Sequence, residues 1–515
     1  MWLRQRARSL LQTRDHVTEE DLARARRLIT VDGVCSMAMA SVQGGPFLTA
    51  FALGVGATNY DLGLVAAIGF LGQAVQLPSL FLLQRFPHRR AITVASAITS
   101  RLTWTFIILT PALFVDRGVS WLLLWLLLSA VLTSAAAPAW NSLLHDLVPA
   151  DRLGRVFSLR TLFGNLVALP LTIGGGLFVD WLSARLPGSE LYAYALLFLV
   201  GLGVGLVGVI VIARLPEPTM AAPEGLRLME LLAQPLRDAN YRRFLVFVGV
   251  WNFAVNLATP FFAAYMLRRL GLPLSTVTAL TVTAQVANLV FLRVWGRLAD
   301  RISNKAVIAT CAPFYLLAFL AWAFTNMPEP HWLTLPILVT IHLVSGMATA
   351  GIGLPIGNIG LKLAPSGSAH AYLTLAGLTG AVSGTLAPMV AGVLADFFAA
   401  RRFGLLLTWS EPSREFQFYA LRLEALDFVF FAAVIVGIYA LSWLARVAEA
   451  GQITEGSVID EAFDEVVLPF RTMSTVEGIR RLTFLPLSAL QRLRRGRERP
   501  VVSGSGLDAG SGGPP

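Results

Sequence analysis

The chain has 515 residues, of which 55% are hydrophobic and only 14% are charged. Soluble proteins carry about 25% charged residues, so this composition excludes an ordinary soluble protein. The net charge of +10 does not indicate nucleic acid binding, because the arginines gather in short connections and in the terminal segments. Cys35 and Cys311 provide neither a disulfide framework nor the spacing of metal ligands.

Apolar stretches of about 20 residues or more recur along the chain, and each can cross a hydrocarbon layer about 30 Å thick. These runs are continuous rather than alternating, so they predict helices and not a membrane barrel. The fold class is therefore all-α integral membrane. Twelve spans are expected, at residues 29–56, 62–84, 91–115, 119–146, 156–181, 190–213, 243–267, 274–297, 305–326, 332–362, 371–399 and 426–446.

A long connection separates six spans from six and predicts two six-helix bundles. The expected parts are an N-terminal segment (1–28), a first bundle (29–214), a linker (215–242), a second bundle (243–447) and a tail (448–515).

The distribution of arginine predicts the orientation. Arginines fill the N-terminal segment and alternate connections, which places both termini in the cytoplasm. The connection before the last span breaks this pattern with four arginines and three glutamates, so we expect an external insertion there that contains a short amphipathic helix. In the tail, arginine mixed with apolar residues fits either an amphipathic segment on the anionic leaflet or an ordinary positively charged tail.

The two halves repeat one another. PFLTAF at 46–51 matches PFFAAY at 260–265, and PAWN at 138–141 matches PIGN at 355–358. GLFVD at 176–180 matches GVLAD at 392–396, and RFPHRRAI at 85–92 matches RISNKAVI at 301–308. The separation stays between 214 and 217 residues, which predicts two pseudo-symmetric bundles.

The charged turn GRLADRISNK at 296–305 and the stretch DLVPADRLGR at 146–155 resemble loops of the major facilitator superfamily of secondary transporters, over about residues 28–446. The resemblance implies two halves that rock about a central site. It also implies a conformational latch made of Gly296, Asp300, Arg301 and Lys305, with the degenerate counterparts Arg85 and Arg89. The alternative is that these basic residues only anchor the cytoplasmic side.

Two features bear on the direction of transport. DLVPADRLGR resembles exporters of this superfamily in particular, so export is preferred. The antiporter signature of the fifth span is only half present, as LPLTIGGG at 169–176. A proton or cation is the candidate coupling ion.

Ionisable residues inside predicted spans are costly and mark candidate sites. Arg101 is either an anion contact or one member of a buried ion pair with Asp32 or another carboxylate. Asp32 is a candidate coupling group, although its place near the cytoplasmic end also suits a structural pairing. His342 is either a titrating group of the cavity or a packing histidine.

Polar amides form the remaining candidate cavity. Asn252 and Asn256 lie one helical turn apart, and Gln285 and Asn288 share a helix face. Gln43 is followed by two glycines. Such amides either line a cavity or tie helices together. Helix breaks and packing positions are expected at Pro46, Pro260, Pro138, Asn141, Pro355, Asn358, Pro170 and Pro388.

The sequence thus predicts a transporter of the cytoplasmic membrane that moves a small molecule by alternating access. The rival hypothesis is a membrane assembly or regulatory protein that keeps the fold without transport. Because the chain lacks a phosphate loop, a metal-ligand cluster and a catalytic triad pattern, no enzyme activity and no cofactor are expected. The expected partners are a small-molecule substrate and the lipid bilayer, without nucleic acid, and the chain is expected to be monomeric.

Overall fold

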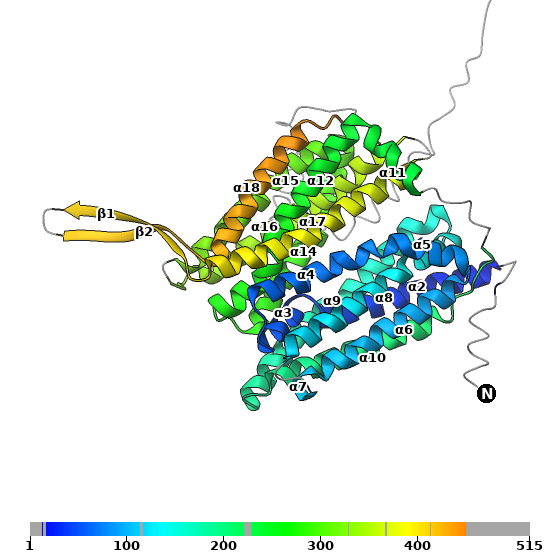
Figure 1. Ribbon diagram of the computed structural model, residues 1–515, viewed down its shortest axis with the longest axis horizontal. Coiled ribbons are helices and arrows are strands. Elements are labelled where there is room, and N and C mark those ends of the chain that lie inside the picture. The colour runs from blue at the N-terminus through cyan, green and yellow to red at the C-terminus, as the bar shows by residue number, and fades with distance from the viewer. Residues whose placement is uncertain are drawn as a thin grey trace, which may run out of the picture. The chain divides into compact units, whose positions relative to one another are not determined.

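The computed structural model describes residues 13, 17–113, 117–220, 228–327, 329–365, 368–411 and 414–449, and all of them belong to one compact unit. Most of them are helical, and the long helices of each half of the chain form a group of their own (Figure 1). The predicted tail lies outside the described residues from residue 450 onward.

The helices of the first half run side by side along one direction (Figure 1). They are α2 (Glu19–Gln43), α3 (Gly45–Gly54), α4 (Asn59–Ala74), α5 (Gln76–Arg85), α6 (Arg89–Ile108), α7 (Thr110–Leu113), α8 (Gly118–Leu147), α9 (Ala150–Arg185) and α10 (Glu190–Ile212).

The second half repeats this arrangement after the short helix α11 (Leu228–Arg237). Its further elements are α12 (Ala239–Ala258), η2 (Thr259–Phe261), α13 (Phe262–Ala264), η3 (Tyr265–Arg269), α14 (Leu274–Arg301), α15 (Asn304–Ala321), η4 (Trp322–Asn326), α16 (Thr334–Lys362), α17 (Ala369–Phe398) and α18 (Leu426–Ala445).

Helix positions follow the predicted spans closely, and the predicted all-α membrane fold is confirmed. Among the described residues, ten helices are long and apolar enough to cross a membrane. The first two predicted spans are each divided, at Gly44 between α2 and α3 and at Val75 between α4 and α5. Helix α2 begins ten residues before its predicted span, because the Thr18 hydroxyl accepts a hydrogen bond from the Asp21 amide and caps an acidic first turn.

Successive spans alternate in direction, so the connections gather at two ends. We call the end that holds α11 and the chain segment after α18 the linker end. The opposite end carries two antiparallel strands, β1 (Arg402–Glu411) and β2 (Arg414–Glu424), and we call it the hairpin end (Figure 1). The expectation of an amphipathic helix in this connection is wrong: its apolar residues alternate with a period of two, which suits strands.

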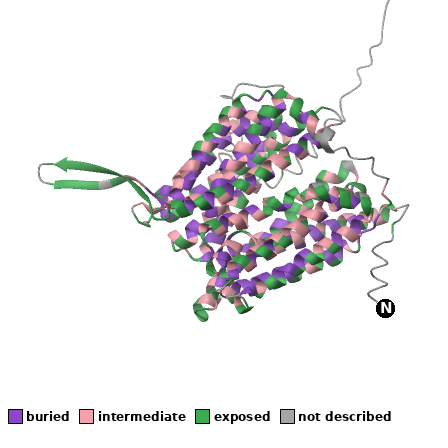
Figure 2. Ribbon diagram, in the orientation of Figure 1, coloured by how far each residue is buried: buried purple, intermediate pink, exposed green. Residues whose placement is uncertain are grey.

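Burial follows the helical groups. Buried residues concentrate on the inner sides of the helices, while exposed residues cover their outer sides (Figure 2). Many of the exposed side chains are large and apolar, among them Leu166 and Ile435. Such a surface suits contact with lipid rather than with water.

Candidate functional site

A cavity of about 690 Å³ lies between the two halves. The first half contributes the helix break at Pro46 with Thr49, and Leu62 of α4. The second half contributes Pro260 and its neighbours, together with residues of α14, α15, η4 and α16. Cavities of 300–1,000 Å³ hold small-molecule ligands. The predicted breaks Pro46 and Pro260 therefore both border this cavity, as the internal repeat requires.

The cavity is lined by apolar side chains and by uncharged polar ones. Three of the predicted residues, Gln285, Asn288 and His342, line it. The amide of Asn288 donates to the Gly346 carbonyl at 3.3 Å, and the amide of Gln285 lies 3.5 Å from the Asn165 oxygen of the first half. None of the described lining residues is an aspartate, glutamate, lysine or arginine.

His342 has a defined hydrogen-bonding role. Its Nδ1 lies 2.7 Å from the carbonyl oxygen of Leu338, one turn earlier in α16. Because a carbonyl can only accept, Nδ1 carries the proton, and in the neutral ring Nε2 is then an acceptor. Trp322 packs edge-on against the imidazole at 5.8 Å between ring centroids. The histidine therefore offers a positioned acceptor at the cavity.

The other predicted cavity residues do not line it. The Gln43 amide donates to the Phe198 carbonyl at 3.0 Å and ties α2 to α10. Asn252 and Asn256 donate to carbonyls of their own helix, at 2.8 and 2.9 Å. Arg101 lies inside the first half. Asn252 and Asn256 lie one turn apart in α12, and neither is among the residues that line this cavity.

Asp32 and Arg101 belong to a buried charged cluster in the first half. Asp32 is 2% exposed, and its carboxylate lies 3.4 Å from the Arg160 guanidinium and 3.5 Å from the Ser36 hydroxyl. The Arg101 guanidinium lies beside it, with both groups against the backbone of Gly208. Arg101 carries one buried nitrogen without a hydrogen-bond partner among the described residues. Asp32 thus pairs with Arg160 while Arg101 lies close by without an ion pair to it, and none of the three lines the cavity.

Two aspartates tie the halves together at the hairpin end. Asp180, at the end of α9, accepts hydrogen bonds from the amides of Leu274 and Ser275 at 3.1 and 2.8 Å, where α14 begins. Asp396, in the last turn of α17, accepts from the Asn59 side chain at 2.9 Å and the Tyr60 amide at 3.0 Å, where α4 begins. A carboxylate at a helix N-terminus is favoured by the unpaired amides and the helix dipole.

A glycine four residues before each aspartate permits the close approach. A Cβ built on Gly176 would lie 3.0 Å from Cα of Ser275, and one built on Gly392 would lie 2.7 Å from Cα of Tyr60. These are the repeated segments GLFVD and GVLAD. We call the two contacts the aspartate ties. A third bond joins the same end, because the Arg268 guanidinium donates to the Ala57 carbonyl at 2.6 Å.

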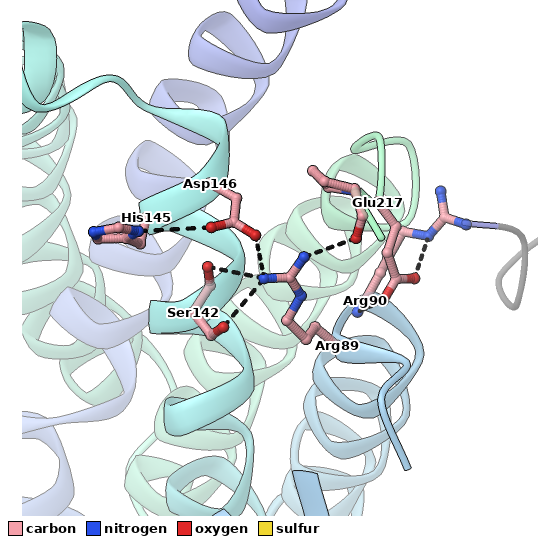
Figure 3. Close-up of polar contacts among 7 residues, drawn as sticks. Arg89, Arg90, Ser142, His145, Asp146 and Glu217 are labelled. Carbon is pink, nitrogen blue, oxygen red and sulfur yellow. Dashed lines mark hydrogen bonds and ion pairs between the residues drawn. The ribbon is translucent and has the colours of Figure 1, made fainter. Parts of the chain in front are cut away.

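At the linker end, the hydrogen bonds and ion pairs described below join elements of the same half rather than one half to the other. In the first half Arg89 is 1% exposed and donates to Asp146 at 2.5 Å, to Ser142 Oγ at 3.1 Å and to the Pro218 carbonyl at 2.8 Å (Figure 3). The neighbouring Arg90 amide donates to Glu217 at 3.1 Å, just after α10. These bonds fasten the start of α6 to α8 and to the chain after α10.

The second half repeats this arrangement with different residues. Glu449, just after α18, accepts from the side chain of Asn304 at 2.8 Å, from the Lys305 amide at 2.8 Å and from Lys362 at 3.0 Å. Burial alone raises the pKa of Glu449, but these bonds outweigh it and hold the pKa below its ordinary value. The Lys305 ammonium donates to the Ala445 and Val447 carbonyls, both at 2.9 Å. Lys305 and Arg89 thus bind within their own halves.

The remaining latch residues lie at the same end. Asp300 is exposed, and its carboxylate makes no hydrogen bond or ion pair with any described residue. Arg301 and Arg85 are also exposed, and Gly296 is half-buried in α14. In this conformation the Asp300 carboxylate is therefore not engaged with the other half.

The predicted packing positions lie within long helices. Pro138, Pro170, Pro355 and Pro388 lie inside α8, α9, α16 and α17, which continue through them. The Asn358 amide donates to the Asn304 side chain at 3.0 Å and joins the Glu449 cluster, whereas Asn141 is exposed.

Several residues of the site are not predicted from the sequence. Asn165, Tyr315 and Trp322 lie at or beside the cavity, and Arg160 and Glu449 complete the two ionic clusters. The internal repeat offered one usable signal. It paired Asp180 with Asp396, and two carboxylates at equivalent helix ends could have been read as a symmetric contact.

The sequence model of the Major Facilitator Superfamily matches residues 33–388. No curated protein sequence matches the chain.

Solved structures share the fold at low sequence identity. The crystal structure of the nucleoside transporter NupG is 12% identical, with a TM-score of 0.60 over 83% of this chain and 99% of that chain. The xylose transporter XylE from E. coli, in an inward open conformation, is 13% identical, with a TM-score of 0.58 over 85% and 99%. A bacterial homolog of the human lysosomal transporter Spinster is 14% identical, with a TM-score of 0.56 over 86% and 98%. This multi-pass membrane chain belongs to the Major Facilitator Superfamily of transporters.

Proposed function

We propose that this protein transports an uncharged, hydrogen-bonding small molecule by alternating access. The observation that carries the proposal is the 690 Å³ cavity between the halves, whose described lining holds amide, hydroxyl and imidazole groups but no ionised side chain. An ionised substrate in such a cavity would lose its hydration without gaining a counter-charge. A neutral molecule with hydroxyl or amide groups can pair with Gln285, Asn288 and His342.

The aspartate ties support the alternating-access part of the proposal. They join the halves at the hairpin end, while Asp300 at the linker end has no partner in the other half among the described residues. The ties consist of helix-end hydrogen bonds, which a rigid-body movement of one half can break and reform. Opening the hairpin end requires their loss, and closing the linker end is the step that would engage Asp300.

The proposed direction of transport and the proposed orientation of the chain in the membrane rest on the sequence. The arginine-rich connections favour termini in the cytoplasm and hence a hairpin end outside it. The DLVPADRLGR stretch favours export. The solved structures of the same fold include a nucleoside and a xylose transporter, so the vesicles of the test are loaded and assayed in both directions.

Asp32 is the candidate coupling group. Protonation of its carboxylate would remove the ion pair with Arg160 and leave two arginines in the same buried cluster. Such a change alters the packing of α2 against α9, and α2 leads directly into the cavity break at Pro46. A substrate-driven proton flux that is lost in Asp32→Asn, with substrate binding retained, is the expected behaviour.

The test uses purified protein in sealed vesicles and a panel of neutral compounds, each paired with a charged derivative. Nucleosides with their monophosphates and xylose with its sugar acid form the starting pairs. We expect flux of a neutral member and at least about tenfold less of its charged partner, as an unpaired ion in an apolar site predicts. Equal flux of both would exclude the substrate class, and absence of any flux would favour the non-transporting alternative.

Matched asparagine variants test the site itself. Asn288→Ala removes an amide at the cavity, while Asn252→Ala removes one that bonds only its own helix. The first should weaken apparent affinity about tenfold, the value of one or two hydrogen bonds to substrate. The second should change it less than about twofold. The reverse order would place the substrate elsewhere.

A further inference from the structure

The β1–β2 hairpin has one apolar face that nothing described covers. The register pairs Phe403 with Leu423, Leu405 with Leu421, and Trp409 with Phe416. Phe403, Leu405, Leu407 and Trp409 alternate along β1 and so share one face. Their partners on β2 lie on the same face, because a bulge opposite Leu405 and Leu406 shifts the β2 register by one residue. We call it the apolar face. The other face holds Gly404 with Arg422, Thr408 with Gln417, and Ser410 with Glu415, and its one apolar pair is Leu406 with Tyr419.

Side-chain contacts agree with this assignment of faces. The Arg422 guanidinium lies 5.8 Å from the Tyr419 ring, and a Cβ on Gly404 would meet that ring at 3.1 Å. On the apolar face, the Trp409 indole donates to the Glu411 carboxylate at 3.1 Å. The base of the hairpin is fixed, because Glu424 pairs with Arg269 at 2.8 Å and with Arg422 at 2.6 Å.

The apolar face becomes more exposed away from this base. Leu423 is buried, whereas Phe403, Leu405, Leu407 and Phe416 are about half-exposed and Trp409 is 63% exposed. A lone two-stranded hairpin is at best marginally stable in water, and a large apolar patch on one is typical of an interface. The hairpin projects beyond the ends of the helices (Figure 1), so a bilayer around those helices leaves its far part outside.

We propose that the apolar face binds the same face of a second copy of this chain. All copies enter the membrane in one orientation, so a second copy presents its hairpin at the same height and pointing the same way. A two-fold axis parallel to the strands then stacks the two apolar faces and keeps both chains upright in one membrane. The sheets become aligned and lie about 10 Å apart.

Charge at the tip favours this arrangement. A two-fold axis parallel to the strands places β1 of one copy opposite β2 of the other, so each residue meets its own cross-strand partner from the second copy. Trp409 then meets Phe416, and Glu411 meets Arg414. The side chain of Arg414, unlike its backbone, has no hydrogen-bond or ion-pair partner among the described residues. The only charged pair on the apolar face is thus complementary between copies.

The small contact area between two hairpins explains why this dimer depends on the membrane. Two strands of ten residues each, with the usual rise per residue and strand spacing, present a face of roughly 300 Å² per copy. Stable soluble complexes bury about 800 Å² per partner. The hairpins alone are therefore a weak pair, and confinement of two oriented chains in one membrane supplies the effective concentration. The sequence suggested a monomer, and each chain of this dimer still holds one complete cavity.

Cross-linking of full-length chains in lipid bilayers tests the face. A chain with Trp409→Cys is coexpressed with a differently tagged chain with Phe416→Cys and treated with a short bifunctional maleimide. Thr408→Cys with Gln417→Cys is the matched control, at the adjacent register position on the other face. We expect about fivefold or more cross-linked heterodimer from the first pair, because the control thiols point away from the partner sheet. Equal yields, or none with protein that still transports, would overturn the proposal.

Exchanging the charges at positions 411 and 414 distinguishes contacts between two copies from contacts within one hairpin. E411R chains carry arginine at both tip positions and R414E chains carry glutamate at both, so each homodimer brings like charges together. Mixing the two should raise the dimer fraction, read by single-molecule photobleaching in bilayers, roughly fivefold over either variant alone. The proposed dimer would be refuted if mixing the variants gave no gain in dimer fraction or if the wild type stayed monomeric. It would also be refuted if lipid or another protein occupied the apolar face.

Discussion

The backbone amide of Lys305 donates a 2.8 Å hydrogen bond to the carboxylate of Glu449, 144 residues later in the chain. In the first half, the amide of Arg90 donates in the same way to Glu217. In both halves a glutamate after the last helix thus holds the start of the third span, and each half is fastened at its linker end as one body. Rocking of two rigid halves requires such internal fastening.

The Glu449 contact makes stability depend on pH with a defined sign. Because the folded pKa lies below the ordinary value of 4.5, the contribution is complete above that value and is lost as pH falls through the folded pKa. Wild type should therefore exceed Glu449→Gln in Tm at pH 7, and the difference should shrink below about pH 4.5. Thermal unfolding in detergent measures it, with exposed Glu20→Gln as the control. A difference that stays constant down to pH 3 would contradict this assignment.

The aspartate ties predict a population shift. Asp180→Asn weakens the two hydrogen bonds that cap α14 from the other half, which should favour the state open at the hairpin end by about 1–2 kcal/mol, a factor of roughly 5–30. Spin-label distances across the hairpin end measure it. Glu190→Gln, an exposed acid at the same end, should leave the distribution unchanged. Because the two ties are equivalent, Asp396→Asn should act in the same direction.

The close approach at Gly392 predicts a steric effect. A Cβ there would lie 2.7 Å from both the carbonyl oxygen of Asn59 and Cα of Tyr60, whereas a Cβ on Gly174 meets nothing within 4 Å. Gly392→Ala must separate α17 from α4, so the hairpin end should open more often, by an amount comparable with the loss of one tie. Thiol accessibility of a cysteine placed in the cavity reports this. Gly174→Ala should match wild type. Equal thiol accessibility in Gly392→Ala and Gly174→Ala would argue against tight closure of the hairpin end.

Asp300 predicts a kinetic effect without a loss of stability. Since its carboxylate has no partner in this conformation, Asp300→Asn should leave Tm within about 1 °C, as for exposed substitutions away from special contacts. Transport should fall, because the opposite conformation loses its latch. Initial rates in vesicles, with Glu20→Gln alongside, measure this. Wild-type rates in Asp300→Asn would remove the latch from the mechanism.

Much of the fold follows from local sequence properties. Span length and hydropathy predict most helix positions to within several residues, because each span must satisfy its own backbone hydrogen bonds. The start of α2, ten residues early, is the largest difference. The first and second spans deviate at Gly44 and Val75, where the helices are divided. The hairpin is not predicted although Phe403, Leu405, Leu407 and Trp409 stand at every second position, because Leu406 interrupts the alternation. Its exposed apolar face resembles neither a buried strand nor a soluble loop.

The site was less accessible to sequence reasoning, because a cavity between two halves depends on how each helix is rotated. Gln285 and Asn288 line the cavity, while Asn252 and Asn256, with equivalent spacing, do not. Nothing within either segment distinguishes them. The buried pairing of Asp32 with Arg160 likewise joins residues 128 positions apart, and only the packing of α2 on α9 brings them together.

The hairpin lengthens one copy of the internal repeat. Asp180 and Asp396 are 216 residues apart, but Glu217 and Glu449, which follow the last span of each half, are 232 apart. The additional 16 residues fall between those markers, where the hairpin stands. The described part of the first half completes its helices without such strands, so removal of the hairpin should return a bundle that still inserts and folds.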